Sequence, residues 1–177
     1  MEGEIKTCCF TGHRPKSLPW GYNEESTHFK EYKARLEQII EKAIKNGYNY
    51  FINGLAEGFD TYALEILIKM RDEKKYEITI EGAIPCTCQD KLWSKESKER
   101  YRQLVKKLDK KTVISNEYTS SCCRERNEYM LSKSNLVISG FSGGTGGTLS
   151  TLRKAKEQGK TIIILNPKTM AIDNALV

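Results

Sequence analysis

Long apolar runs are missing from this 177-residue sequence, and no stretch approaches the ~20 consecutive apolar residues that a membrane-spanning helix needs. The N-terminal segment also lacks the basic and then apolar pattern of a secretory signal. Hydrophobic residues make up 38% and charged residues 29%, which supplies a core and argues against general disorder. We therefore expect one domain over residues 1–177, with its core at about 7–166 and a short tail, located in the cytoplasm without membrane contact.

Metal-ligand spacing is absent as well. The six cysteines form three close pairs: Cys8–Cys9, Cys86 and Cys88, and Cys122–Cys123. None of these pairs has the two-residue gap of a zinc knuckle, and the two histidines of the chain lie far from the last two pairs. The sequence therefore predicts reduced thiols, several of them buried, with no metal site and no bound cofactor.

The charge balance is mildly basic, with 29 Lys and Arg against 23 Asp and Glu and a net charge of +6. Such a balance is compatible with an anionic ligand or with nucleic acid. The lysine-rich stretch from Lys91 to Lys111 contains interspersed glutamates and lacks the aromatic interleaving of a single-strand-binding surface. We interpret that stretch as a solvent-exposed helix face first, and nucleic acid as a possible but less favoured partner.

Short apolar runs alternate with segments of helical periodicity along the chain. Strands are expected at residues 7–10, 48–52, 76–84, 112–114, 136–138 and 161–165, and helices at about 29–44, 60–68, 92–108, 124–133 and 149–155. Pro85 is expected to close the third strand, Leu92 to be buried with its helix, and the residues after Pro167 to form the tail. This order predicts an α/β fold with a parallel sheet covered on both faces, so ligands would bind at the carboxyl ends of its strands.

A glycine-rich segment, Ser139–Thr148, follows one of these strands and opens a helix. Five glycines between Gly140 and Gly147 exceed what a turn requires and predict an anion site at the helix N-terminus. Leu149 replaces the third glycine of the dinucleotide motif, and no Gly-Lys-Ser/Thr of an ATP-binding P-loop follows. Ser142 matches the G-x-S-x-G nucleophile motif, but no histidine follows it in the chain, so we interpret it as a loop hydroxyl.

Three further segments contribute candidate ligand residues. In Thr11-Gly12-His13-Arg14-Pro15, an imidazole and a guanidinium directly follow a strand and could meet phosphate or ribose groups. In Asn53–Asp60, Gly54 would let a ligand approach the backbone, while Asp60 is expected to cap the next helix. The third segment, Arg124–Met130, offers Arg126 and Asn127 for a phosphate and for a base or ribose hydroxyl.

Taken together in this order, T-G-H-R-P, N-G-x-A-x-G-x-D, R-N-x-Y-M and G-G-T-x-x-T-x-x-x-A resemble the YpsA-like family of the SLOG superfamily. That superfamily also contains DNA-processing protein A and the Lonely Guy phosphoribohydrolases. The likeness spans roughly residues 7–165 and implies a Rossmann-like three-layer sandwich that binds nucleotides or relatives of ADP-ribose. Carried over by motif, the ligand-binding residues would be Thr11, Gly12, His13, Arg14, Gly54, Asp60, Arg126, Asn127, Gly146, Gly147 and Thr148.

One departure from the Lonely Guy pattern bears on activity. Its catalytic glutamate, three residues after the threonine of the glycine motif, corresponds here to Thr151, and the proline that opens that motif is missing. Glu57 or Glu81 could substitute, so no catalytic residue is assigned. We expect binding of a nucleotide-derived ligand, with nucleoside monophosphate phosphoribohydrolase activity and DNA binding as the alternatives, and a homodimer as a possible assembly.

Overall fold

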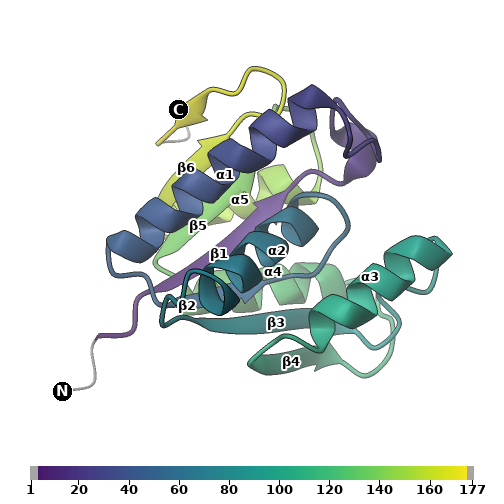
Figure 1. Cartoon of the computed structure of the whole chain (residues 1–177). Coiled ribbons are helices and arrows are strands. Elements are labelled where there is room, and N and C mark those ends of the chain that lie inside the picture. The colour runs from purple at the N-terminus through teal and green to yellow at the C-terminus, as the bar shows by residue number, and fades with distance from the viewer. Residues whose placement is uncertain (1–3, 175–177) are drawn as a thin grey trace.

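A seven-stranded sheet runs through the centre of the protein in the order β4-β3-β2-β1-β5-β6-β7 (Figure 1). The computed structural model describes residues 4–174. The strands are β1 (Thr7–Gly12), β2 (Tyr50–Asn53), β3 (Thr79–Cys86), β4 (Lys110–Ser115), β5 (Leu136–Gly140), β6 (Thr161–Leu165) and β7 (Ile172–Asp173). Neighbouring strands from β4 to β6 are parallel, and β7 is antiparallel to β6. The α/β class and the mostly parallel sheet are confirmed.

Helices cover both faces of this sheet. They are α1 (Thr27–Lys45), α2 (Phe59–Asp72), α3 (Lys95–Val105), α4 (Cys122–Lys133) and α5 (Gly147–Glu157), with a short 3-10 turn, η1 (Pro15–Ser17). Figure 1 shows α1 and α2 in front of the sheet and α4 and α5 behind it, while α3 lies beside α2. The sequence starts α1 at a defined point, because the Ser26 hydroxyl accepts a hydrogen bond from the Phe29 N–H at 3.1 Å.

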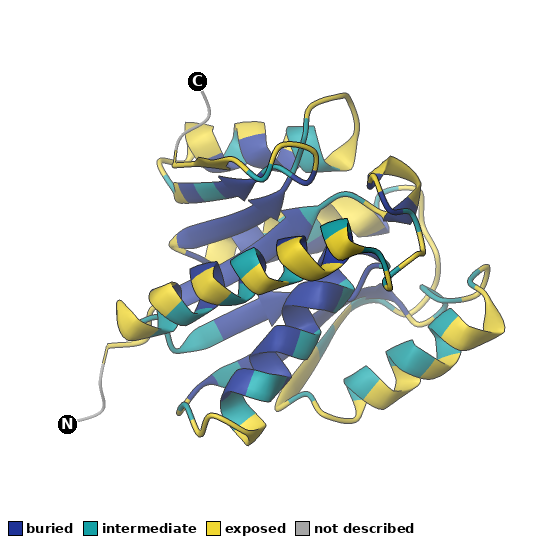
Figure 2. Cartoon of the chain, turned by 45° about the horizontal axis from the view of Figure 1, so that its top comes forward, coloured by how far each residue is buried: buried dark blue, intermediate teal, exposed yellow. Residues whose placement is uncertain are grey.

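The alternation of side chains along each strand divides the core into two clusters. Cys8 and Phe10 of β1 pack with α1 and α2, whereas Cys9 packs with Met130 of α4 and Leu152 of α5. The central strands of the sheet and the inner faces of the helices are buried in Figure 2, whereas the edge strands β4 and β7 and the outer faces of the helices are largely exposed. A sheet that is buried on both sides explains why its strands read as almost continuous apolar runs.

The chain order of the strands creates a switch point between β1 and β5. From β1 the chain continues to β2 on one side, and it returns to the other side of β1 only when it reaches β5. The loops after β1 and β5 therefore leave the sheet side by side and turn to opposite faces. In open parallel sheets this crevice is the usual place for a ligand.

Three details differ from the sequence expectations. Strand β3 continues through Pro85 to Cys86, which is possible because β2 ends at Asn53, opposite Gly82, and leaves that edge of β3 unpaired. Leu92 is not buried: its exposed fraction is 93%, because α3 begins only at Lys95 and the preceding residues form a loop.

The third difference concerns the residues after Pro167. They do not form only a tail, because Ile172 and Asp173 pair with the end of β6 as strand β7. Within residues 4–174, no helix combines the length and the apolar character needed to cross a membrane.

Candidate functional site

His13 joins the loop after β1 to the loop after β5. Its backbone N–H donates to the Gly140 carbonyl at 2.9 Å, and its ring Nε2 accepts from the Ser142 N–H at 3.1 Å. Burial, aided by the positive charge of Lys168, lowers the pKa of His13 and favours the neutral ring that can accept this bond. No local sequence pattern indicates this contact, because the two residues are 129 positions apart and only the pairing of β1 with β5 brings them together.

The Ser142 hydroxyl also lies 3.2 Å from His13 Nε2, which raises the question of a serine nucleophile. A nucleophile elbow holds its serine on a strained turn, and its histidine must have a free lone pair. Here the residues with positive φ in this loop are glycines, and the Ser142 N–H already occupies the lone pair of Nε2. The arrangement therefore anchors the glycine loop to β1.

The guanidinium of Arg126 is buried inside the site, with 5% of the residue exposed. Its Nη1 donates to the Gly54 carbonyl and its Nε donates to Asn127 Oδ1 at 2.8 Å. A Cβ on Gly54 would overlap this guanidinium and lie 2.9 Å from Asp60 Oδ2. The space beside Gly54 that was expected to admit a ligand is thus occupied by Arg126, and the glycine is needed for this close packing.

Asp60 does not cap α2, contrary to the expectation. Within the described residues the N-cap of α2 is Gly58, without a side-chain cap, and Asp60 Oδ2 instead accepts from the Ala56 N–H at 3.3 Å. Asn53 supports the same loop by donating its Nδ2 to the Asp60 carbonyl at 2.8 Å. Burial raises the pKa of Asp60, and the nearby positive charge of Arg126 opposes that rise.

Asn127 and Thr151 connect α4 to α5. Asn127 Nδ2 donates to Thr151 Oγ1 at 3.1 Å, and the Thr151 hydroxyl donates to the Gly147 carbonyl at 2.9 Å. Thr151 is 4% exposed. The position that holds a catalytic glutamate in the Lonely Guy pattern is therefore a buried hydroxyl that fixes the first turn of α5.

The glycine loop has the most open backbone in the site. Gly143, Gly144 and Gly146 have positive φ angles of 100°, 104° and 115°, which favour glycine at each position. Apart from their chain neighbours and, for Gly147, the backbone of its own helix, no atom of residues 4–174 lies within 4 Å of a Cβ built on any of these three or on Gly147. The loop leads directly into α5, beside the half-buried Thr148, so unblocked N–H groups and the helix dipole are available to an anion.

Thr11 and Gly12, in contrast, are packing residues. Thr11 is buried within β1, and a Cβ on Gly12 would overlap the ring of Phe59. Gly140, opposite Gly12 in the sheet, meets the same ring. The neighbouring strands β1 and β5 thus each end in a glycine because the buried ring of Phe59 packs against both positions.

A pocket of about 690 Å³ opens beside Arg14, over the carboxyl ends of β1, β2 and β3. It is lined by three cationic side chains, three aromatic rings and four thiols, among other residues: Arg14, Lys16, Lys91, Tyr22, Trp93, Tyr118, Cys86, Cys88, Cys122 and Cys123. Arg14 itself is exposed. Of the predicted residues, Arg14 lines this pocket, and its neighbour His13 contacts the glycine loop, which is outside the pocket lining.

Gln89 supplies a further polar group in this pocket that the sequence did not single out. Its Nε2 donates to the Gly54 carbonyl at 3.0 Å, which leaves Oε1 as an acceptor. Oε1 is buried and has no hydrogen-bond partner among the described residues. Because an unpaired buried acceptor costs about 1–3 kcal/mol, a ligand donor at this point would be stabilising.

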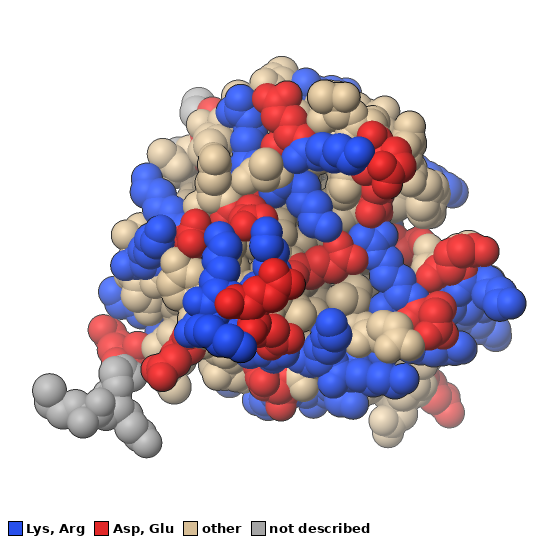
Figure 3. Space-filling view, in the orientation of Figure 1, with Lys and Arg blue, Asp and Glu red and all other residues tan. Residues whose placement is uncertain are grey.

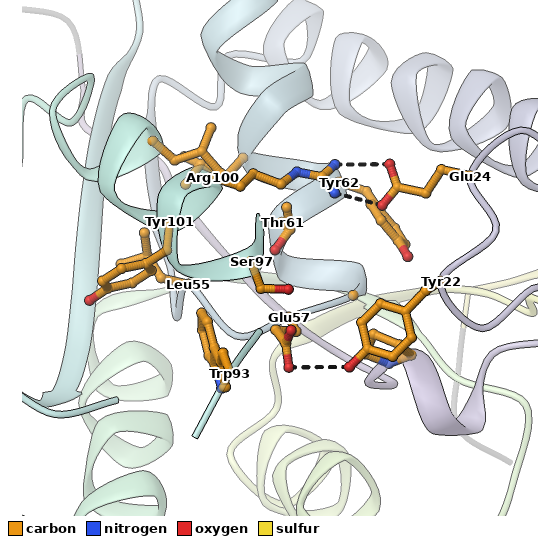
Figure 4. Close-up of a pocket in the computed structure, with 14 residues that line it drawn as sticks. Tyr22, Glu24, Leu55, Glu57, Thr61, Tyr62, Trp93, Ser97, Arg100 and Tyr101 are labelled. Carbon is orange, nitrogen blue, oxygen red and sulfur yellow. Dashed lines mark hydrogen bonds and ion pairs between the residues drawn. The ribbon is translucent and has the colours of Figure 1, made fainter. Parts of the chain in front are cut away.

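A second pocket, of about 40 Å³, is too small for a nucleotide (Figure 4). Arg100 crosses it. Its hydrogen bond of 2.7 Å to Glu65 docks α3 against α2, and its bonds of 2.6 and 3.0 Å to Glu24 join α3 to the loop before α1. Glu57 lines both pockets and accepts from the Tyr22 hydroxyl at 3.5 Å. It is therefore a carboxylate that a ligand in the larger pocket can reach.

Glu81, the other carboxylate considered as a substitute, lies elsewhere. It is 1% exposed near the amino end of β3 and accepts hydrogen bonds of 2.6 Å from each of three hydroxyls, on Tyr50, Thr112 and Tyr129. Burial opposes ionisation, but these donors hold the pKa of Glu81 below its ordinary value. Its role is structural, and Glu57 is the better candidate at the pocket.

In the part of the chain that the structure describes, no group of three or more His, Cys, Asp and Glu side chains is arranged to hold a metal ion. The polar groups at the site are instead cations, amides, hydroxyls and backbone N–H groups. Such groups bind anionic and hydrogen-bonding organic ligands.

Nearly the whole chain matches the sequence model of one known protein family. The YpsA model, described as the YspA SLOG family, matches residues 8–167. The chain belongs to this SLOG family. It is also 32% identical over 141 residues to the uncharacterized SPbeta prophage-derived protein YoqJ of Bacillus subtilis (strain 168), covering 71% of this chain and 80% of YoqJ.

Two solved structures share the SLOG fold. DNA processing protein A (DprA) from Streptococcus pneumoniae superposes with a TM-score of 0.61 at 17% identity, over 90% of this chain and 50% of that protein. DprA from Helicobacter pylori, whose structure concerns its single-stranded DNA binding mode, gives a TM-score of 0.58 at 15% identity over 96% and 69%. The chain thus spans about half the length of the S. pneumoniae protein, and these likenesses show the fold.

Proposed function

We propose that this protein binds a nucleotide or a nucleotide-derived molecule of the ADP-ribose type at the carboxyl ends of β1, β2, β3 and β5. The observation that carries the proposal is the pocket of about 690 Å³ beside Arg14. Its volume lies within the ~300–1,000 Å³ range of small-molecule sites. A pocket that combines cations with aromatic rings suits a ligand that combines phosphates with a base.

An elongated ligand fits the arrangement of the two subsites. His13 contacts the glycine loop, and the next residue, Arg14, lines the pocket. A phosphate over the N-terminus of α5 would be held by N–H groups from Gly146, Gly147 and Thr148. A second phosphate would meet Arg14, and the base would enter the pocket toward the aromatic rings and Gln89 Oε1.

Arg126, Asn127, Gly54 and Asp60 contribute to this site indirectly in the proposal. Their hydrogen bonds join the loop after β2 to the start of α4, so they shape the pocket wall from within. Direct ligand contacts are proposed for Arg14 and the glycine loop.

The test is calorimetric titration with ADP-ribose and with AMP, together with mass spectrometry of any nucleotide released when protein purified from cells is denatured. Arg14→Ala removes a charge-assisted hydrogen bond worth ~1.5–3 kcal/mol, so its affinity should fall roughly ten- to hundred-fold. Arg35→Ala is the matched control, because the half-buried Arg35 lies on α1, away from the pocket lining, and pairs with Glu31 in the same helix. Absence of any bound nucleotide, or equal affinities for parent and Arg14→Ala, would refute the proposal.

Binding of single-stranded DNA is a second candidate, favoured by the likeness to H. pylori DprA and by the cations and rings that line the pocket. Against it, positive and negative side chains are interspersed over the face seen in Figure 3. Titration of a labelled oligonucleotide between about 50 and 200 mM salt separates the candidates. A protein that neutralises six to ten phosphates loses about 10³–10⁵ in affinity over that range, whereas a ligand with two phosphates loses far less.

A further inference from the structure

Four of the six cysteines meet in the wall of the large pocket, although they come from two distant segments. Cys86 ends β3, Cys88 follows in the next loop, and Cys122 and Cys123 begin α4. The sulfurs of Cys86 and Cys88 are 3.3 Å apart, and the Cys122 thiol is close enough to those of Cys86 and Cys123 to be influenced by them. The sequence showed only close pairs along the chain, and the fold converts two of these pairs into one cluster.

The thiols of this cluster differ in the direction in which their surroundings shift the pKa. Burial raises the pKa of Cys86 to about 11, so it remains protonated. Burial also opposes ionisation of Cys122, but hydrogen bonds from Thr119 and from the neighbouring thiols outweigh it and lower the pKa of Cys122. Cys122 also lies in the first turn of α4, where the helix dipole favours a thiolate.

We propose that Cys122 and Cys86 form an oxidisable thiol pair that a hydroperoxide converts to a disulfide between α4 and β3. The Cys122 thiolate attacks the terminal, OH-bearing oxygen of the peroxide, so that an S–O bond forms and the O–O bond breaks. The leaving group is hydroxide from hydrogen peroxide and alkoxide from an organic hydroperoxide. The Cys86 thiol then attacks the sulfur of this sulfenic acid. The S–S bond forms, the S–O bond breaks, and the hydroxyl leaves with the thiol proton as water.

The geometry supports this pairing over the others. Cys122 and Cys86 lie near each other in the wall of one pocket, and side-chain rotation must bring their sulfurs to the ~2.05 Å of a disulfide. A bridge between Cys86 and Cys88 would close a ring across a single intervening residue, and one between Cys122 and Cys123 would join neighbours, so both are strained. Because both Cys86 and Cys122 line the open pocket, a small peroxide can reach them despite their low exposure.

Cys8 and Cys9 provide an internal control within the same molecule. They lie in β1 at the centre of the sheet, at 0% and 1% exposure. Burial raises the pKa of Cys8 well above its usual value and that of Cys9 to about 12. In the folded protein they should stay reduced while the pair in the pocket is oxidised.

The experiment treats the full chain with hydrogen peroxide in the presence of a metal chelator, blocks remaining thiols with N-ethylmaleimide, and maps tryptic peptides without reduction. Cleavage after lysine and arginine places Cys86 in peptide 76–91 and Cys122 in peptide 112–124. We expect these two peptides to appear as one cross-linked species that disappears after treatment with dithiothreitol. Absence of the cross-link while Cys123 alone is oxidised would overturn the proposal.

Because each of the two peptides contains two cysteines, four variants then identify which sulfurs form the disulfide. The cross-link should be lost in Cys122→Ser and in Cys86→Ser, and it should remain in Cys88→Ser and in the matched control Cys123→Ser. Circular dichroism checks the fold of each variant, and Cys86→Ala replaces Cys86→Ser should a buried hydroxyl prevent folding. A cross-link that persists without Cys86 or without Cys122 would show that the assignment is wrong.

Discussion

The loop after β2 and the loop after β5 are both rich in glycine, but the structure uses their glycines differently. In the loop after β2, the space beside Gly54 is filled by the Arg126 guanidinium, and the space beside Gly58 by the His13 carbonyl. In the loop after β5, the space beside Gly143, Gly144 and Gly146 is open among the described residues. One loop is closed by the protein's own polar groups, and the other presents its backbone outward.

This difference shows that a glycine motif at a strand end has two possible physical causes. In the first, a neighbouring side chain needs the room that a Cβ would take. In the second, the backbone needs an unusual φ or access to a ligand. The comparison can be tested, because substitutions in the closed loop should affect stability and substitutions in the open loop should affect binding.

The largest effect is expected for Arg126→Ala. Removing the guanidinium leaves the Gly54 carbonyl without its donor on α4 and leaves the buried Asp60 without its nearby cation. Losing one member of a buried charged network costs about 3 kcal/mol, so the free energy of unfolding should fall by about that amount. Urea unfolding followed by circular dichroism measures the change.

Arg124→Ala is the matched control, two residues earlier on the same helix. The Arg124 side chain is 69% exposed, so this variant should change the free energy of unfolding by no more than about 0.5 kcal/mol. Equal stabilities of the two variants would mean that Arg126 does not hold the closed loop together.

The next largest effect is a difference in stability between substitutions at a packed glycine, Gly140, and at an open one, Gly147. In Gly140→Ala the new methyl group would overlap the ring of Phe59 and lie 2.6 Å from the Tyr32 hydroxyl, so we expect a loss of about 1–3 kcal/mol. Gly147→Ala has open space and a helical backbone, so it should be neutral or gain about 0.4–1 kcal/mol. Thermal and urea unfolding of the two variants measure this difference. Equal losses of stability in Gly140→Ala and Gly147→Ala would contradict the distinction between packed and open glycines.

Gly147→Val tests whether a substitution in the open loop lowers ligand affinity without lowering stability. The branched side chain stands where N–H groups are proposed to approach a phosphate, so affinity for ADP-ribose should fall about ten-fold, or ~1.4 kcal/mol. Stability should change little, because this part of the loop has no packing to lose. Calorimetry beside urea unfolding separates the two effects, and unchanged affinity would place the phosphate elsewhere.

Most of the fold could be predicted from the sequence, because apolar runs and helical periodicity report burial directly. The failures have local causes. Leu92 reads as part of a helical face but belongs to a loop, since the periodicity of α3 says nothing about where its first turn begins. Strand β7 has two residues and depends on its pairing with β6, a contact that no local pattern encodes.

The site was predictable only as a set of loops. The parallel order of the strands correctly brings the loops after β1 and β5 together, as the contact between His13 and Ser142 shows. What the sequence could not show is which polar side chains are already paired. Arg126 and Asp60 looked like ligand residues because their types bind phosphate or cap helices, yet both are engaged inside the protein.

The smallest expected effect is a pH dependence of stability at the contact between the two loops. Burial lowers the pKa of His13 from its ordinary value of 6.5, so between that value and the folded-state pKa the unfolded chain binds more protons than the native one. Stability is therefore lost as the pH falls below about 6.5, and the loss is complete below the folded-state pKa. Protonated Nε2 can no longer accept the Ser142 N–H, so the glycine loop is released as well.

His13→Gln removes this proton-binding group while leaving the carboxylates unchanged, so the difference between parent and variant isolates the histidine. Urea unfolding at about pH 7.5 and about pH 5.5 should show the parent losing more stability than the variant on acidification. The affinity of the parent for ADP-ribose should then be measured over the same interval. Should parent and variant respond equally to acid, the contact of His13 would not hold the open loop after β5 to the loop after β1.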